Sequence, residues 1–99
     1  MDRSEYVKTE HRGIPLGEWI PLPEELEDGR AYVKLILYKT KKSYAVAVFD
    51  GYGKLMDNGV PTTRYTHPDR EYRETFDEAI TALEDKIEER GLKMTKGKA

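Results

Sequence analysis

The chain has 99 residues, enough for one domain with a modest core but too few to enclose a deep substrate cavity readily. It contains no cysteine, which excludes disulfide bonds, thiolate nucleophiles and Cys-rich zinc sites. Charged residues make up 36% of the chain, yet the formal net charge is only −2, so the total charge does not require a polyanionic partner.

The N-terminal residues 1–13 are polar and mixed in charge, with Tyr6 and Val7 as their main apolar side chains. This composition predicts a flexible N-terminus. No apolar segment has the length of a signal-peptide core or of a membrane span, so we expect a cytoplasmic protein. Abundant Glu and Lys and the absence of Gln are typical of thermophilic proteins, although the heat-labile pair Asn58-Gly59 argues against such a source.

Prolines interrupt the next apolar segment, 14–23. Proline is excluded from helix interiors and central strands, yet this segment also contains Trp19 and several aliphatic residues. We therefore expect an extended proline-containing segment that lies over the core, at the start of a single globular domain spanning 14–92. After Pro23, acidic residues followed by Gly29 predict one short helical turn.

Two strand patterns follow, 31–39 and 43–50, joined by Thr40-Lys41-Lys42. Both are rich in β-branched and aromatic residues, which predicts an antiparallel hairpin. Its register stays open, because a shift of one residue moves every side chain to the opposite face. Either register leaves apolar residues on both faces, so we expect the extended segment with Trp19, or a second copy of the chain, to cover the face that the helix leaves free.

Short strands are predicted at 54–56 and 62–66, after turns at 50–53 and 57–59. They complete an expected antiparallel sheet of three to four strands. His67-Pro68-Asp69 ends the last strand, because proline cannot donate a hydrogen bond to a neighbouring strand. The charged stretch 69–74 is interpreted as a connection that leads into a helix.

The helix is predicted from Thr75 to Arg90. Thr75 and Glu78 form a capping box, and Gly91 is suited to the left-handed residue that ends a helix. The residues Phe76, Ala79, Ile80, Leu83 and Ile87 form one apolar stripe. The stripe predicts that the helix packs on one face of the sheet, giving an α+β fold of β-β-β-α order, followed by a flexible basic tail at 93–99.

The order of three strands followed by a helix resembles that of small β-β-β-α domains such as the WGR domain and the N-terminal part of the HicB antitoxins. The segment 49–53 stands where the turn of a WGR domain would fall, without its Trp-Gly-Arg signature. The glycine-cysteine turn of HicB requires a cysteine, and the chain has none. The resemblance therefore implies a fold and transfers no functional residues.

Residue types that could support catalysis are sparse. His11 lies in the polar N-terminus, and His67 with Asp69 and Glu71 lies in the charged connection, where we expect solvent-exposed side chains. No nucleophile motif is present, and Asp50-Gly-Tyr-Gly lacks the length and the Lys-Ser/Thr ending of a phosphate-binding loop. We therefore predict a protein that is not an enzyme and has no metal or cofactor.

Two binding functions remain. The apolar excess on the sheet, seven tyrosines and Trp19 favour a protein partner or a homodimer. The alternative is single-stranded nucleic acid, held by aromatic and basic residues of the hairpin and sheet. Neither function involves a membrane or a small-molecule substrate. The candidate partner-binding residues are Tyr32, Lys34, Tyr38, Lys39, Lys41, Lys42, Tyr44 and Arg64.

Two observations weigh against the nucleic-acid alternative. Tyrosines are ordinary strand residues, and lysines commonly protect hairpin ends from aggregation. The outward side of the predicted helix is also acidic and would repel phosphates if it lay near the basic residues; it carries Glu84, Asp85, Glu88 and Glu89.

Overall fold

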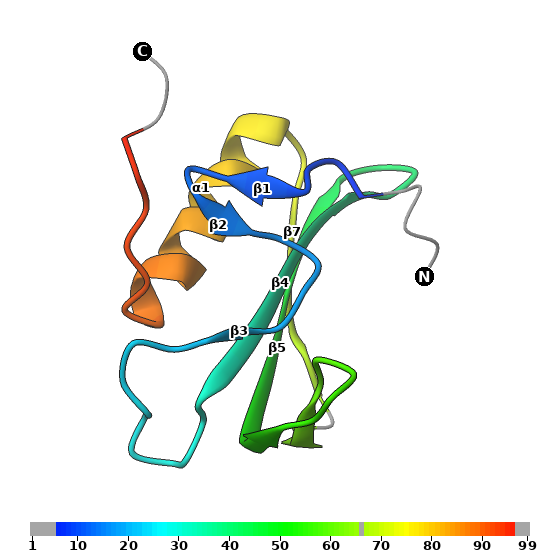
Figure 1. Ribbon diagram of the computed structural model, residues 1–99. Helices are drawn as coiled ribbons and strands as arrows, with labels where there is room; N and C mark the ends of the chain where they lie inside the picture. The colour runs from blue at the N-terminus through cyan, green and yellow to red at the C-terminus, as the bar shows by residue number, and fades with distance from the viewer. Residues whose placement is uncertain (1–5, 66, 97–99) are drawn as a thin grey trace.

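The computed structural model describes residues 6–65 and 67–96 and shows an antiparallel sheet with one C-terminal helix on one face (Figure 1). This architecture confirms the predicted α+β fold. Residues 1–5 of the predicted flexible N-terminus and residues 97–99 of the predicted basic tail lie outside the described residues, so the flexibility of both ends stays a prediction. No helix in the described part of the chain is long and apolar enough to cross a membrane.

The main sheet has five strands, more than the predicted three to four. Its order is β3-β4-β5-β6, and β7 also pairs with β5. A separate two-stranded hairpin is formed by β1 (Glu10–His11) and β2 (Ile14–Pro15). The strands of the main sheet are β3 (Ile20–Pro21), β4 (Tyr32–Lys39), β5 (Tyr44–Leu55), β6 (Pro61–Arg64) and β7 (Asp69–Arg73).

β5 is long enough to pair with two strands along one edge. β7 pairs with its first half and β6 with its second half. The short strand predicted at 54–56 is therefore mostly the end of β5, and the strand predicted at 62–66 is β6, with Thr66 outside the described residues. The interpretation of 69–74 as a connection was wrong, because β7 obtains its pairing from β5 without apolar side chains of its own.

The hairpin of β4 and β5 has a four-residue loop at 40–43, closed by the backbone N–H of Thr40, which donates to the carbonyl of Ser43 at 2.8 Å. This loop fixes the register that the sequence left open. Leu35 lies opposite Val48 and Leu37 opposite Val46, and these residues face the helix. The opposite side of the sheet, here called the second face, carries Ile36 opposite Ala47, Tyr38 opposite Ala45 and Lys34 opposite Phe49.

Helix α1 (Phe76–Glu89) confirms the predicted caps. Thr75 Oγ1 accepts a hydrogen bond from the backbone N–H of Glu78 at 3.2 Å, and Gly91 has a φ of 75°. Of the predicted stripe, Ala79, Leu83 and Ile87 are fully buried, whereas Phe76 is 37% exposed. Phe76 lies at the rim of the core, edge-on to Tyr44 with ring centroids 5.7 Å apart.

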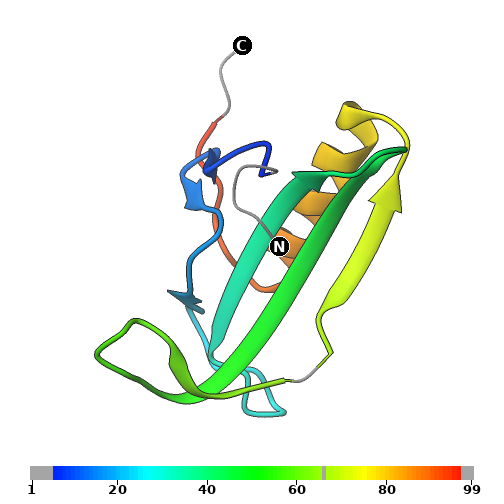
Figure 2. The same ribbon diagram turned by 90° about the vertical axis from the view of Figure 1, so that its right-hand side faces the viewer.

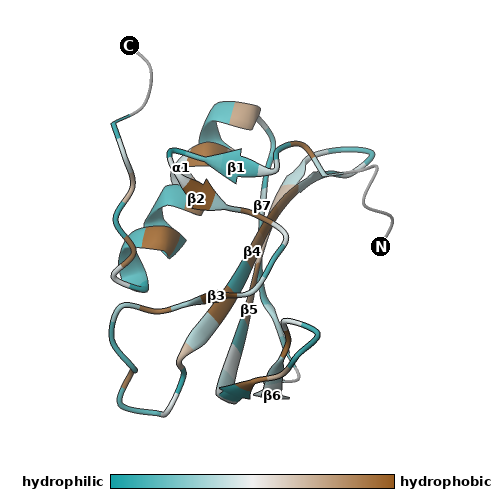
Figure 3. Cartoon of the chain, in the orientation of Figure 1, coloured by the Kyte–Doolittle hydropathy of each residue, from teal (hydrophilic) through white to brown (hydrophobic). Residues whose placement is uncertain are grey.

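The core lies between α1 and the sheet. Buried hydrophobic residues of β2, β4, β5 and α1 form it, and Ile20 of β3 packs against it (Figure 3). Ile14, Leu16 and Leu22 of the extended segment join this helix-side core instead of covering the second face. Trp19 reaches residues of the second face, since the Lys34 Nζ atom lies 5.5 Å from the centroid of its ring. After Pro23 the chain forms turns rather than the predicted helical turn.

The β1-β2 hairpin is held to α1 by a cluster of charged residues. The His11 side chain is 8% exposed; its Nε2 donates to Glu84 Oε2 at 2.9 Å, and its Nδ1 accepts from Lys8 Nζ at 2.8 Å. Arg12 Nη1 donates to the same Glu84 oxygen at 3.0 Å. The hydrogen bond from His11 lowers the pKa of Glu84 below its ordinary value, and the hydrogen bond from Arg12 adds to this effect against the opposing effect of burial.

This lowered pKa predicts a pH dependence of stability. Glu84 is charged in both states above its ordinary value of 4.5, so its contribution to the free energy of unfolding is complete there and is lost as the pH falls through the lower folded value. We expect Glu84→Gln to be less stable than the wild type at neutral pH and the difference to shrink in acid. Urea unfolding at a series of pH values from neutral to acid measures the difference in the free energy of unfolding between the variant and the wild type. A difference that is constant with pH would contradict this assignment.

Candidate nucleic-acid interface

The acidic residues of the main sheet all face the helix. Strands β4 to β7 lie within the described residues and contain Asp50, Asp69 and Glu71 as their acidic residues. Asp50 lies opposite Val33, which belongs to the helix-side core, and Asp69 and Glu71 lie opposite Val48 and Val46 of the same core. Because side chains alternate along a strand, these pairings place all three carboxylates on the helix side.

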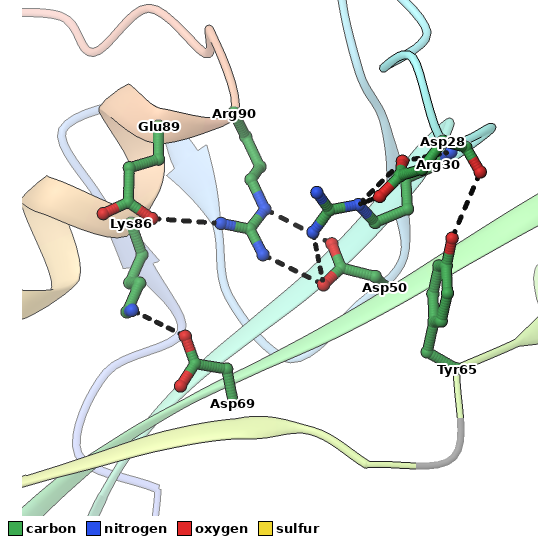
Figure 4. Close-up of polar contacts among 8 residues, drawn as sticks. All are labelled: Asp28, Arg30, Asp50, Tyr65, Asp69, Lys86, Glu89 and Arg90. Carbon is green, nitrogen blue, oxygen red and sulfur yellow. Dashed lines mark hydrogen bonds and ion pairs between the residues drawn. The ribbon is translucent and has the colours of Figure 1, made fainter.

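Basic side chains at the end of α1 pair with these carboxylates. The Arg90 side chain, 7% exposed, donates through Nη2 to Asp50 Oδ2 at 2.9 Å and through Nε to Asp50 Oδ1 at 3.2 Å (Figure 4). Arg30 approaches Asp50 from the other side, with Nη1 3.4 Å from Oδ2. The Asp50 carboxylate is therefore shared by two guanidinium groups and ties the C-terminal end of α1 to β5.

Lys86 holds both acidic residues of β7. Its Nζ atom lies 2.6 Å from Asp69 Oδ2 and 2.9 Å from Glu71 Oε1. Burial by itself would lower the pKa of Lys86, but the hydrogen bonds to Asp69 and Glu71 and their negative charges outweigh it and raise the pKa above its ordinary value. The acidic side chains of the sheet are thus engaged on the helix side.

The charged residues of the described strands on the second face are basic. Figure 2 views the sheet with α1 behind it. The basic residues of the second face are Lys34 on β4, Arg64 opposite Gly51, and Arg70 opposite Ala47. Since the acidic residues of β4 to β7 all face the helix, the charged strand residues of this face are basic. Among the described strands β4 to β7, the acidic residues therefore lie on the helix side, whereas basic residues lie on both sides, with Lys39 and Arg73 on the helix side.

A pocket of about 360 Å³ lies at one end of the second face, lined by Trp19, Lys34, Phe49, Arg64 and Tyr65. The Lys34 Nζ atom lies 4.9 Å from the ring centroid of Phe49 and 5.5 Å from that of Trp19, within the range of cation–π contacts. Tyr65 is 39% exposed, and its hydroxyl donates to the carbonyl of Asp28 at 3.3 Å (Figure 4). The pocket therefore combines aromatic rings with two basic groups.

A second aromatic group lies at the other end of the second face. Tyr38 and Tyr72 flank Ala45 from β4 and β7. Tyr38 is 6% exposed, and burial, followed by a hydrogen bond with Tyr72, raises the pKa of its hydroxyl. Tyr72 is 56% exposed. Between the two ends, the apolar residues Ile36, Ala45 and Ala47 are 3%, 0% and 0% exposed.

The structure separates the predicted site residues into three groups. Lys34, Tyr38 and Arg64 lie on the second face, as does Tyr32, which is opposite Gly51. Lys39 and Tyr44 are opposite each other on the helix side, where the Lys39 Nζ atom lies 5.1 Å from the Tyr44 ring centroid. Lys41 and Lys42 are exposed in the hairpin loop.

The prediction omitted Phe49, Tyr65, Arg70 and Tyr72 and treated Trp19 as a cover for the sheet. The sequence does contain a signal for β7: residues 69–73 alternate between Asp69, Glu71 and Arg73 on one side and Arg70 and Tyr72 on the other. An alternation of period two is typical of a strand, but here it is limited to the signs of charge of Asp69, Arg70 and Glu71, since Arg73 shares the side of the two acids.

Among residues 6–65 and 67–96, no group of three or more His, Asp and Glu side chains is arranged to hold a metal ion. Comparison of the chain with protein-family models, curated proteins and solved structures finds no match. The geometry of the second face is therefore the basis for assigning a function.

Proposed function

We propose that the protein is a cytoplasmic, non-enzymatic module that binds single-stranded nucleic acid on the second face of its sheet. The observation that carries this proposal is that the charged residues of the described strands on the second face are basic, with the acidic residues of β4 to β7 on the helix side. Arg64 and Arg70 can neutralise phosphates, and the neighbouring rings of Trp19 and Phe49 can stack with bases. Aromatic side chains beside basic ones on a sheet surface are the usual elements of such a binding site.

The position of α1 removes the main objection from the sequence. The acidic side of the helix would repel phosphates close to the basic residues, but α1 lies on the opposite face (Figure 2). Asp50, Asp69 and Glu71 also face the helix and pair there with Arg90 and Lys86. A polyanion on the second face would therefore meet basic strand residues first.

A protein partner or a second copy of the chain is the second candidate for the same face. The exposure of Tyr72 (56%) and Tyr65 (39%) favours it, because tyrosines are enriched in interfaces. The apolar centre argues against it, since Ile36, Ala45 and Ala47 are already buried and offer little surface to a partner. Sedimentation of the protein alone at several concentrations tests self-association. A sedimentation coefficient that rises with protein concentration, and that Tyr72→Asp lowers again, would support a homodimer.

Binding can be followed through Trp19, the single tryptophan of the chain. We expect its fluorescence to change when oligo(dT) or oligo(U) is added at low salt, and the logarithm of the association constant to fall linearly with the logarithm of the salt concentration. A fluorescence that stays constant at low salt, together with unchanged electrophoretic mobility of the oligonucleotide, would refute the proposed function.

The variant Arg64→Ala tests the assignment of the second face. Arg64 is exposed, so its removal is expected to leave the fold intact while weakening binding and reducing the salt slope by about one. Lys93→Ala is the matched control, because Lys93 is also exposed but follows α1, where it lines a pocket with Glu88 and Glu89. Equal losses of affinity in the two variants would contradict binding on the second face.

A further inference from the structure

We infer that a bound single strand is anchored by one base in the pocket at Trp19 and Phe49 and runs from there over β6 and β7, past Arg64 and Arg70, towards Tyr72. This inference rests on the proposed function and specifies the ligand as a short single strand of about four nucleotides or more. Three features carry it: the size and lining of the pocket, the positions of the basic residues along β5, and the exposed tyrosine at the far end.

The pocket has the size and the lining that a single base requires. Its volume of about 360 Å³ lies at the lower end of the range of small-molecule sites, roughly 300 to 1,000 Å³. Trp19 and Phe49 are half-buried, so they are held in place but remain partly accessible. The rings of Tyr65 and Tyr52 lie 5.4 Å apart, and the hydroxyl of Tyr65 is bonded to Asp28, which orients this wall of the pocket as well.

Two basic residues, Arg64 of β6 and Arg70 of β7, form a line along one side of β5, and Lys34 of β4 lies on its other side. Arg64 lies opposite Gly51, Lys34 opposite Phe49 and Arg70 opposite Ala47. These β5 positions are alternate residues of the second face, so neighbouring ones are about 7 Å apart and the line is about 14 Å long. At the rise of about 3.4 Å per stacked nucleotide, this length corresponds to about four nucleotides.

The line ends at an exposed ring. Tyr72 lies opposite Ala45, the next second-face residue of β5 beyond Ala47, and is 56% exposed. A base can therefore stack on Tyr72 when the strand is long enough to extend past Arg70. Tyr38 lies on the other side of Ala45 on the same face, but it is buried and offers no free ring.

The experiment compares a trinucleotide with an oligonucleotide of about ten residues, both of thymidine, by titration of Trp19 fluorescence. Phe49→Leu removes a ring from the pocket and is expected to weaken both ligands about ten-fold. Tyr72→Ala removes the distant ring and is expected to weaken the longer ligand about ten-fold and the trinucleotide less than two-fold. Circular dichroism checks that the variants fold; if Phe49→Leu does not, Arg64→Ala replaces it as the pocket variant.

The outcomes separate the two proposals. A wild-type protein that binds neither ligand refutes the proposed function and this inference with it. Binding in which Tyr72→Ala weakens the trinucleotide as much as the longer ligand, or in which neither variant affects either ligand, overturns the inference and leaves the proposed function standing. We expect the pocket variant to weaken binding of both ligands and Tyr72→Ala to weaken binding of the longer ligand.

Discussion

Leu83→Asp is expected to abolish the cooperative thermal transition that circular dichroism records for the wild type. Leu83 is fully buried in the core between α1 and the sheet, together with Leu35, Leu37 and Ile87. The substitution removes an apolar side chain and buries a carboxylate that has no partner there. Each effect costs several kcal/mol, against a net stability of about 5 to 15 kcal/mol for a typical domain.

Thr81→Asp is the matched control, since it introduces the same side chain on the exposed side of the same helix. It is expected to keep a sharp transition within a few degrees of the wild type. A sharp transition in Leu83→Asp as well would show that α1 does not pack on the sheet through this residue.

The second large effect is expected at the buried ion pair between Asp50 and Arg90. Asp50→Ala leaves the Arg90 guanidinium, whose side chain is 7% exposed, with a longer contact of 3.3 Å to the exposed carboxylate of Glu89. Removing one partner of a buried pair typically costs about 3 to 5 kcal/mol, because the remaining charge stays buried without compensation. Urea denaturation measures the loss of the free energy of unfolding.

Two further variants test whether the cost arises from the unpaired charge. Asp57→Ala in the exposed turn at 57–59 is the matched control, and we expect it to change the free energy of unfolding by less than about 0.5 kcal/mol. Adding Arg90→Met to Asp50→Ala is expected to restore part of the loss, since it removes the uncompensated charge. If the double variant Asp50→Ala/Arg90→Met loses as much free energy of unfolding as the two single variants together, the cost does not arise from the unpaired charge.

The Asp50–Arg90 pair also bears on the candidate site. Asp50 and its pairing with Arg90 and Arg30 keep a carboxylate on the helix side of β5, away from the second face. The same network reaches the pocket through the contact of Tyr65 with Asp28 (Figure 4). The charge of Asp28 is itself favoured, since the hydrogen bond from Arg30 lowers its pKa.

Sequence reasoning predicted the elements whose signals are local. The helix was recognised because Thr75, Glu78 and Gly91 act on neighbouring backbone groups, and the structure shows all three in their expected roles. The strands of the long hairpin were recognised from their β-branched and aromatic residues. Such signals need no knowledge of distant parts of the chain.

β7 and the register were out of reach for the opposite reason. Asp69 and Glu71 lie on the helix side of β7, where Lys86 of another element pairs with both and Arg73 pairs with Glu71. The register depends on a loop in which Thr40 bonds to Ser43, and a single-residue change in that loop would exchange the two faces. Both features depend on contacts between side chains whose proximity the sequence does not reveal.

Some features of the candidate site follow from the residue types in the sequence, and others follow from the tertiary structure. The sequence alone was enough to single out Lys34, Tyr38 and Arg64 and to list nucleic acid as an alternative, since these residue types have the required chemistry. Their common face, the exclusion of Lys39 and Tyr44, and the addition of Phe49, Arg70 and Tyr72 follow from the strand pairing. The physical reason is that alternation gives each strand two faces, while only the packing of α1 determines which of them is buried with the acidic residues.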